Sequence, residues 1–250
     1  MLTAPPHLSP SSINTFQQCP LKFKFSKIDG LMEPPTVHTL LGNFVHDILE
    51  SLYNLSIDQR TMPVARALAR SHWEETYEAK VESLSLNKHD FRWKAWWCVE
   101  NLYKIEDPIE TCPAGIEYEV NGQIEGVTVK GFIDRFEVLD DNTLLISDYK
   151  TGKVPSPKYM DDKFQQLFIY AAMVDALGVG SASRVSLMYL VAPKVLSRDV
   201  TQESIEATVE TIVSTKKQID IYCEEENFPA KQSGLCNFCH FKKMCPAWVR

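Results

Sequence analysis

Apolar residues recur at helical spacing through the first part of the chain. In GNFVHDILESLYNL one helix face carries five of them, Val45, Ile48, Leu49, Leu52 and Leu55. The stretches PVARALARSHWEETYEAKV and FRWKAWWCVENLYKI continue this pattern. Closer to the N-terminus, Ser9-Pro10 is typical of a helix start, and Pro20 interrupts or bends the helix that follows. Residues 1–110 are therefore predicted to form a helical region.

The spacing becomes strand-like in the middle of the chain. The segment GIEYEVNGQIEGVTVKGFIDRFEVLDDNTLLISDYKT is rich in β-branched and aromatic residues. Two groups of turn-forming residues, Asn121-Gly122 and Asp140-Asp141-Asn142, interrupt it. This pattern predicts a three-stranded antiparallel meander.

Helix and strand then alternate towards the C-terminus. KFQQLFIYAAMVDALG is predicted to be a helix that ends at Gly178, and a strand, RVSLMYLVA, and a long helix from Thr201 to about Glu224 follow. The tail CNFCHFKKMCPAWVR is too short to form an apolar core of its own. We therefore predict three parts: a helical region (1–110), a core (111–225) and a tail (226–250).

The second turn of the meander defines a register. If Asp140-Asp141-Asn142 form the loop, Leu139 pairs with Thr143, and Asp134 lies opposite Asp148. Directly opposed residues on one sheet face are about 5 Å apart at Cβ. The sequence therefore predicts two facing carboxylates, although a slip of one residue would turn Asp134 to the other face.

Facing carboxylates indicate a metal site. Like charges so placed are destabilising unless a cation lies between them, and a divalent ion such as Mg²⁺ provides one. Strand alternation puts Lys150 on the same face as Asp148 and Tyr149 on the other. Lys150 would then lie where it could orient water or stabilise charge on a phosphate. The alternative is a hairpin with two solvent-facing acids and a surface lysine.

Composition restricts the class of protein. A hydrophobic fraction of 44% with 24% charged residues is that of a globular domain. No apolar run approaches the roughly 20 residues of a membrane span, and the N-terminus lacks the features of a signal peptide, which predicts a soluble, cytoplasmic protein. The net charge of -7 means that a nucleic acid would have to meet a local basic patch.

Seven cysteines in such a chain favour metal ligands or reduced thiols over disulfides. Cys236, Cys239 and Cys245 form the pattern C-x2-C-x5-C, and a tetrahedral thiolate site needs a fourth ligand. The spacing leaves five candidates for that ligand: Cys19, Cys98, Cys112, Cys223 and, for a zinc site, His240.

The order of these segments resembles the PD-(D/E)xK nucleases, specifically their RecB-like exonuclease branch. GFIDR, the hairpin and DYKTGK resemble the family's second and third motifs. That branch has a histidine on an early helix, matched by His46 in GNFVHDILE, and Gln-x-x-x-Tyr after the hairpin, matched by Gln166 and Tyr170. The resemblance implies an α/β fold with a restriction-endonuclease-like core, a mixed central sheet flanked by helices, an N-terminal helical region and a stapled C-terminal tail.

The resemblance also implies which cysteines act together. Iron-sulfur members of the family, including AddB and the CRISPR-associated RecB-like exonucleases, combine one upstream cysteine with a terminal C-x2-C-x5-C group. FQQCP and CNFCHFKKMC are similar. The implied cofactor is a [4Fe–4S] cluster that joins the N-terminal helix to the tail, with zinc as the alternative. Its ligands would be Cys19, Cys236, Cys239 and Cys245.

The activity implied by the resemblance is that of a metal-dependent DNA exonuclease. Lys150 would position water, and Gln166 and Tyr170 would contact DNA or the water network. One or two Mg²⁺ or Mn²⁺ ions would be held by His46, Asp134, Asp148 and the backbone carbonyl of Tyr149. A basic patch for DNA would come from Lys153, Lys158 and Lys163.

Substrate and partners are further expectations from the family. Single-stranded DNA ends degraded from 5′ to 3′ are expected, in DNA repair, recombination or CRISPR adaptation. A separate helicase, recombinase or CRISPR adaptation complex would be the partner. The alternatives are a non-catalytic iron-sulfur module that binds DNA ends or a partner, and a zinc-containing DNA-binding protein.

Overall fold

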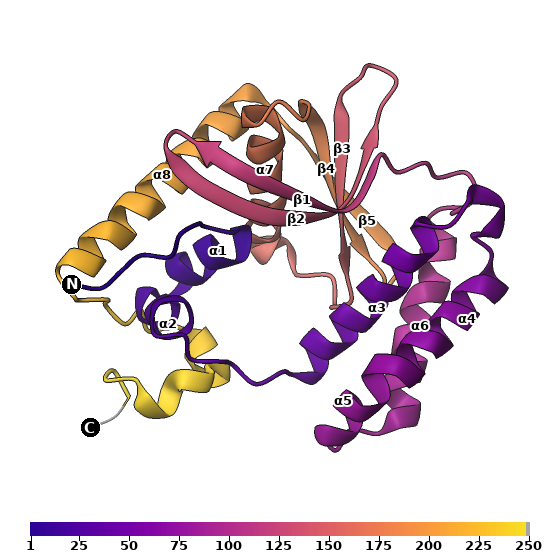
Figure 1. Ribbon diagram of the computed structural model, residues 1–250, viewed down its shortest axis with the longest axis horizontal. Helices are drawn as coiled ribbons and strands as arrows, with labels where there is room; N and C mark the ends of the chain where they lie inside the picture. Colours follow the sequence, from indigo (N-terminus) through magenta and orange to yellow (C-terminus); the bar gives the residue numbers. More distant parts are fainter. Residues whose placement is uncertain (249–250) are drawn as a thin grey trace.

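A mixed β-sheet with helices on both sides forms the centre of the molecule (Figure 1). The computed structural model describes residues 1–248. Within these residues five strands follow one another across the sheet in chain order: β1 (Gly115–Ile124), β2 (Val127–Val138), β3 (Leu144–Lys150), β4 (Ala182–Tyr189) and β5 (Lys194–Asp199). The pair β3–β4 is parallel and the other pairs are antiparallel. The sheet is therefore mixed, as expected.

The α-helices of the described chain precede, interrupt and follow the strands. They are α1 (Pro10–Gln18), α2 (Pro20–Phe23), α3 (Val37–Tyr53), α4 (Met62–His72), α5 (Glu78–Ser83), α6 (Lys88–Ile105), α7 (Asp161–Ala176) and α8 (Gln202–Glu224). Two π-helical turns extend this set, since Lys24–Ile28 continues α2 and Trp73–Tyr77 joins α4 to α5. The region before the sheet is thus helical, as predicted.

The start of α1 follows directly from the sequence. The Ser12 amide donates a hydrogen bond to Ser9 Oγ, and the Ser9 amide donates one to Ser12 Oγ. Pro10 is the first helical residue. The helix ends at Gln18, and α2 begins at Pro20, which has no amide hydrogen to continue α1. The predicted start and interruption are both confirmed.

The sheet separates two hydrophobic clusters. In β4, Val185 and Leu187 pack into a cluster with α1, α7 and α8, whereas Met188 and, just beyond the strand, Leu190 pack into a cluster with α3 to α6. Both faces of the parallel pair are therefore covered, as in other parallel sheets. The first cluster includes N-terminal residues such as Phe16, so α1 and α2 share the core of the sheet. The three-part division of the chain stays a prediction.

The first turn of the meander differs from the prediction. β1 and β2 turn at Glu125 and Gly126, whose φ angles of 46° and 79° are both positive, as a tight hairpin turn requires. The predicted turn at Asn121-Gly122 is wrong, because both residues lie inside β1. A Cβ on Gly122 would lie 2.2 Å from Leu177 Cδ2, so this glycine provides room for the helix end above it.

The second turn has the predicted register. The Leu139 amide bonds to the Thr143 carbonyl at 2.8 Å, and Arg135 pairs with Ser147 further along β2 and β3. The paired residues end at Arg135–Ser147, and directly beyond them Asp134 Oδ2 accepts a hydrogen bond from the Tyr149 amide. The predicted arrangement of the two strands is thus confirmed.

Strand β5 was not expected from the sequence. It pairs antiparallel with β4 at the edge of the sheet, and its residues are mostly exposed. Without a buried face, the strand lacks the alternation of apolar and polar residues by which strands are recognised. The predicted strand RVSLMYLVA accordingly ends early, at Tyr189.

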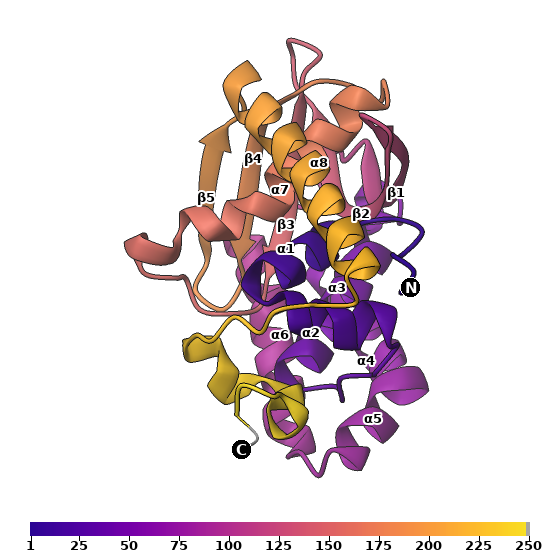
Figure 2. The same cartoon turned by 90° about the vertical axis from the view of Figure 1, so that its left-hand side faces the viewer.

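The C-terminal tail lies beside α2, a segment from the other end of the sequence (Figure 2). It forms two short 3₁₀ turns, Gly234–Phe238 and His240–Met244. The ring of Phe241 packs 5.3 Å from that of Phe25, centroid to centroid. No helix of the described chain is both long and apolar enough to span a membrane.

Candidate active site

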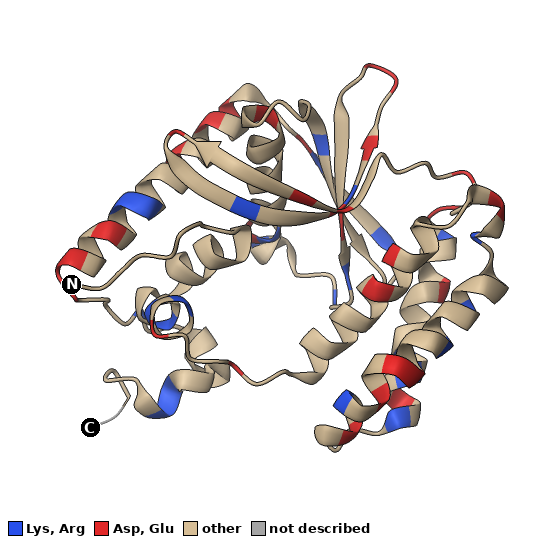
Figure 3. Cartoon of the chain, in the orientation of Figure 1, with Lys and Arg blue, Asp and Glu red and all other residues tan. Residues whose placement is uncertain are grey.

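Three side chains suited to bind a metal meet beside the start of the β2–β3 pairing. His46 comes from α3, Glu117 from β1 and Asp134 from β2, and one ligand atom of each lies within 4.8 Å of the other two. His46 Nδ1 is 3.6 Å from Glu117 Oε1 and 3.5 Å from Asp134 Oδ2. Figure 3 shows acidic segments where these strands come together. Imidazole nitrogen and carboxylate oxygens together form a donor set for a divalent metal.

Glu117 was missed by the sequence analysis. The pairs Ile116–Arg135 and Tyr118–Ile133 enclose Glu117 and Asp134, so these two acids face each other across β1 and β2. Glu117 has a φ of 42°, in the left-handed region that non-glycine residues rarely adopt. Such strain persists where the surroundings impose it, often at functional sites. A turn placed at Glu125-Gly126 would have revealed this pairing from the sequence.

The main chain of Tyr149 orients His46. His46 Nε2 lies 3.0 Å from the Tyr149 carbonyl oxygen. Because a carbonyl only accepts hydrogen bonds, Nε2 carries the hydrogen, and Nδ1 faces the two carboxylates. Burial disfavours the charged imidazolium, but Glu117, Asp134 and Asp148 outweigh it and raise the pKa of His46 to about 9. The pocket thus attracts positive charge, which a metal ion would supply in place of the proton.

Asp134 is buried among like charges. It is 8% exposed, and its Oδ2 accepts a hydrogen bond of 2.9 Å from the Tyr149 amide. Burial, followed by the negative charge of Asp148, raises the pKa of this carboxyl, and His46 opposes the shift. A divalent cation would remove that repulsion, so the residues present fit such an ion.

Asp148 and Lys150 form an ion pair next to this group. Lys150 Nζ is 2.6 Å from Asp148 Oδ2, although the approach lacks hydrogen-bond geometry, and this buried oxygen has no hydrogen-bond donor among the described residues. Burial would lower the pKa of Lys150, but the adjacent Asp148 raises it overall, so the lysine is charged. The three-residue group contains Glu117 rather than Asp148, and Asp148 as a metal ligand stays a prediction.

Helix α7 brings the predicted glutamine and tyrosine together. Gln166 Nε2 donates to the Tyr170 hydroxyl at 3.5 Å, as their spacing of four allows. Tyr170 lies over Gly131 of GFIDR, where a Cβ would come within 2.7 Å of Tyr170 Cε1. Burial is the main reason that the pKa of Tyr170 is raised to about 12, with smaller contributions from Asp134 and Asp148. Contact with DNA stays a prediction for both residues.

The three lysines proposed for DNA binding lie on the surface. Lys153 follows β3, and Lys158 and Lys163 lie just before and within the first turn of α7, all exposed. None of these three lysines forms an ion pair with an acidic side chain of the described residues. They are free to meet phosphates, and this role stays a prediction.

The four cysteines of the expected cluster line one cavity of about 150 Å³, between α1–α2 and the tail: Cys19, Cys236, Cys239 and Cys245. The Lys231 amide donates to Cys19 Sγ at 3.5 Å and the Ser233 amide to Cys236 Sγ at 3.4 Å. Of the described cysteines, no three have sulfurs within 4.8 Å of one another. The structure therefore shows a shared cavity and no closely packed thiol cluster.

The other cysteines lie apart from this cavity. Cys98 and Cys223 are buried in the two hydrophobic clusters, and Cys112 is exposed. Burial raises the pKa of Cys98 to about 12, which keeps its thiol protonated. These positions fit ordinary thiols rather than ligands.

Comparison with known proteins gives the family. The model of the PD-(D/E)XK nuclease superfamily matches residues 7–246. The Gene 69 proteins of Mycobacterium phages D29 and L5 are 24% and 21% identical, each over 97% of this chain and 97% of the phage protein. A "Putative exonuclease" of Eubacterium rectale has a similar fold, with a TM-score of 0.58 and 13% identity over 94% of this chain and 87% of that one. Because the family model spans nearly the whole chain, this protein belongs to the PD-(D/E)XK nuclease superfamily.

Proposed function

We propose that this protein is a DNA exonuclease that depends on Mg²⁺ or Mn²⁺. The observation that carries the proposal is the group of His46, Glu117 and Asp134, whose ligand atoms lie within 4.8 Å of one another. Asp148 and Lys150 lie on the adjoining strand, so an acid and a charged lysine adjoin the metal position. The proposal includes Glu117 as a metal ligand in addition to the ligands that the family resemblance implies.

The metal and the side chains would divide the work of phosphodiester hydrolysis. When bound, a divalent ion lowers the pKa of water and stabilises charge on the phosphate. Lys150, held by Asp148, would orient the attacking water and neutralise charge on the phosphate oxygens. Water adds to phosphorus, the bond to the leaving oxygen breaks, and that oxygen takes a proton. Gln166 and Tyr170 would contact the DNA backbone or the water around it.

The substrate within this proposal is a single-stranded DNA end, degraded from 5′ to 3′. Its support is the resemblance of the motifs to RecB-like exonucleases. The exposed Lys153, Lys158 and Lys163, which follow β3 and precede or begin α7, would meet the phosphates. A helicase, a recombinase or a CRISPR adaptation complex would supply the DNA end.

A second part of the proposal is a [4Fe–4S] cluster in the cysteine cavity. The cavity supports it, because residues 217 positions apart in sequence, Cys19 and Cys236, line the same space. Amide hydrogen bonds to the sulfurs are also typical of cluster ligands.

The cluster is tested by the visible absorption and iron content of an anaerobic preparation. Brown protein with about four irons per chain, as the cluster formula requires, is expected. A colourless protein with stoichiometric zinc would contradict the cluster and leave the nuclease proposal standing.

The nuclease proposal is tested by digestion of end-labelled DNA. Single-stranded and duplex DNA are incubated with Mn²⁺, Mg²⁺ or EDTA, with wild type beside Lys150→Ala. Metal-dependent shortening with wild type alone is expected, and the position of the label reports polarity. If metal-loaded wild type leaves every DNA intact, the module that binds DNA ends without cleaving them becomes the better description.

A further inference from the structure

Tyr149 contacts the metal group through both of its main-chain polar atoms. Its amide donates to Asp134 Oδ2 at 2.9 Å, and its carbonyl oxygen lies 3.0 Å from His46 Nε2. The His46 and Tyr149 rings meet edge to face, with centroids 5.9 Å apart. Tyr149 also separates Asp148 from Lys150 in the chain. A shift of this one residue would therefore move several parts of the site together.

The side chain of Tyr149 points to the face of the sheet that α3 to α6 cover, where Arg135 holds its hydroxyl. The tyrosine is 4% exposed, and its hydroxyl lies 3.2 Å from Arg135 Nη1. The guanidinium carbon is 5.7 Å from the centre of the same ring. The side chain is thus fixed at its tip, far from the main-chain atoms that contact the site.

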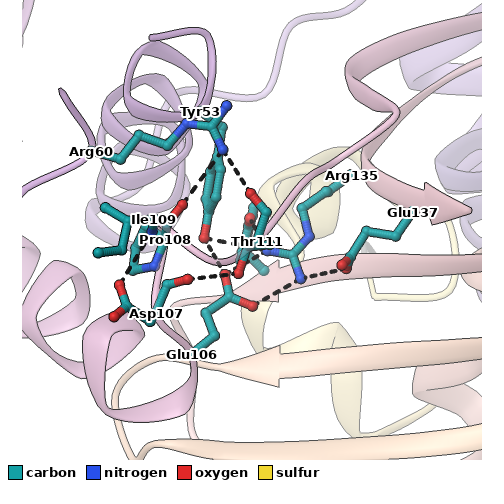
Figure 4. A network of polar contacts seen from close by, with 10 residues as sticks. Tyr53, Arg60, Glu106, Asp107, Pro108, Ile109, Thr111, Arg135 and Glu137 are labelled. Atoms are coloured by element: carbon teal, nitrogen blue, oxygen red, sulfur yellow. Dashed lines mark hydrogen bonds and ion pairs between the residues drawn. The ribbon is translucent and has the colours of Figure 1, made fainter. Parts of the chain in front are cut away.

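Arg135 is itself held from several sides (Figure 4). Its guanidinium pairs with both carboxylate oxygens of Glu106, just after α6, and with Glu137 Oε1 at 2.9 Å. The Tyr53 hydroxyl at the end of α3 lies 3.4 Å away and bonds to Glu106 as well. With its side chain 3% exposed, Arg135 is a rigid attachment point.

We propose that Arg135, acting through the Tyr149 hydroxyl, is a positioning residue for the metal site. The hydroxyl anchors the Tyr149 ring, the ring fixes the main chain at this point of β3, and the main chain orients Asp134 and His46. The inference rests on the proposed function, because it assigns a role in metal binding. Groups that orient metal ligands are typically worth 10-fold to 100-fold in affinity or activity.

The experiment compares two variants that each remove one hydroxyl from the same network. Tyr149→Phe removes the link between Arg135 and the site. Tyr53→Phe is the matched control, because its hydroxyl contacts Arg135 and Glu106 but no atom of the metal group. A merely structural role of the network predicts similar effects of both substitutions.

Three quantities are measured on each full-length protein. Mn²⁺ affinity is measured without DNA, by the loss of the free-ion signal in electron paramagnetic resonance. Steady-state cleavage separates kcat from KM. Hydrogen exchange at the amide of residue 149, followed by NMR in metal-free protein, reports the bond to Asp134.

For Tyr149→Phe we expect Mn²⁺ affinity and kcat to fall about 10-fold to 100-fold, with KM for DNA unchanged and faster exchange of the residue 149 amide. For Tyr53→Phe we expect changes below about 3-fold. Arg135→Lys keeps the charge but loses the forked donor geometry, so it should reproduce the effect of Tyr149→Phe. Agreement of the two variants would show that the effect does not come from a folding defect of one of them. Equal losses in Tyr149→Phe and Tyr53→Phe, or none in either, would overturn the inference.

Failure of the inference and failure of the proposed function give different results. Wild type that binds Mn²⁺ but cleaves no DNA would contradict the nuclease, while the ratio of Mn²⁺ affinities would still decide whether Tyr149 positions the ligands. Wild type that cleaves DNA and variants that bind Mn²⁺ equally well would contradict only the positioning role.

Discussion

At the scale of single residues, the candidate site is a set of buried charges that need one another. Asp134 and Asp148 repel across two strands, and His46 and Lys150 lie close enough to offset them. Removing one partner of a buried ion pair lowers the free energy of unfolding more than replacing both partners by apolar residues does. The reason is that the remaining charge is left without compensation. Substitutions here should therefore be judged by metal affinity and by stability together, with a matched control outside the group of charges.

The role of Glu117 can be tested by Glu117→Gln. The amide keeps the shape of the side chain but loses the negative charge, so Mn²⁺ affinity and cleavage should fall at least about 10-fold. Calorimetric titration with Mn²⁺ measures the affinity, and a gel assay measures cleavage. Glu119→Gln is the control, since Glu119 is two residues along the same strand and exposed, paired with Lys130. Equal effects of the two substitutions would exclude Glu117 from the site.

The contact between Gly131 and Tyr170 predicts a loss of stability. In Gly131→Ala the new Cβ would lie 2.7 Å from Tyr170 Cε1, and forcing the two apart should lower the free energy of unfolding by about 1–3 kcal/mol. Urea denaturation measures the change. Gly152→Ala, where no atom lies within 4 Å, should stay within about 0.5 kcal/mol of wild type. A Gly131 variant as stable as wild type would mean that α7 can move away freely.

At the scale of elements, the network around Arg135 joins the helical region to the sheet. Glu106 follows α6, Tyr53 ends α3, and Arg135 lies in β2, so one buried guanidinium connects two helices and two strands. The same helices supply His46 and cover the Tyr149 face of the sheet. Their placement relative to the strands therefore determines whether the histidine reaches the carboxylates.

Removal of this connection should destabilise the protein. In Arg135→Met the buried Glu106 loses its charged partner, and the free energy of unfolding should fall by about 3–5 kcal/mol. Arg184→Met is the comparison, because its ion pair with Asp199 is exposed and should contribute at most about 1 kcal/mol. Urea denaturation of both variants decides. Similar losses would show that the buried pair contributes no more than a surface one.

At the scale of the whole molecule, a segment near the start of the chain and one near its end meet at the cysteine cavity. Cys19 follows α1, while the other three cysteines come from the tail (Figure 2). The tail is too short to form a core of its own, and its Phe241 packs against Phe25 in the π-helical turn that continues α2. A cofactor at this position would hold it more strongly than such packing can.

Loss of one cavity cysteine should release the tail. We expect Cys239→Ser to lose the iron of the proposed cluster. Trypsin should then cleave it after Lys231, Lys242 or Lys243 at least about 10-fold faster than wild type, because the local unfolding that exposes these sites becomes easier. Mass spectrometry of the fragments measures this. Cys112→Ser, at an exposed cysteine outside the cavity, should behave as wild type. Equal rates of trypsin cleavage for wild type and Cys239→Ser would show that the tail stays folded without the proposed cluster.

Local chemistry explains which features were predictable. Ser9 and Pro10 specify the start of α1, and the loop at Asp140-Asp141-Asn142 specifies a register that puts Asp134 opposite Asp148. Both depend on residues close in sequence. Glu117 was missed because Asn121-Gly122 is a stronger local turn pattern than Glu125-Gly126, where the β1–β2 turn lies.

The sequence by itself determined the family motifs, most helices, the β2–β3 register and the candidates Asp134, Asp148 and Lys150, because each depends on spacing within one segment. Only the tertiary structure decided that Glu117 joins His46 and Asp134, that the β1–β2 turn lies at Glu125-Gly126, and that β3 and β4 are parallel. These features depend on how helices and strands far apart in sequence pack, and the burial of both sheet faces, rather than any local pattern, selects that packing.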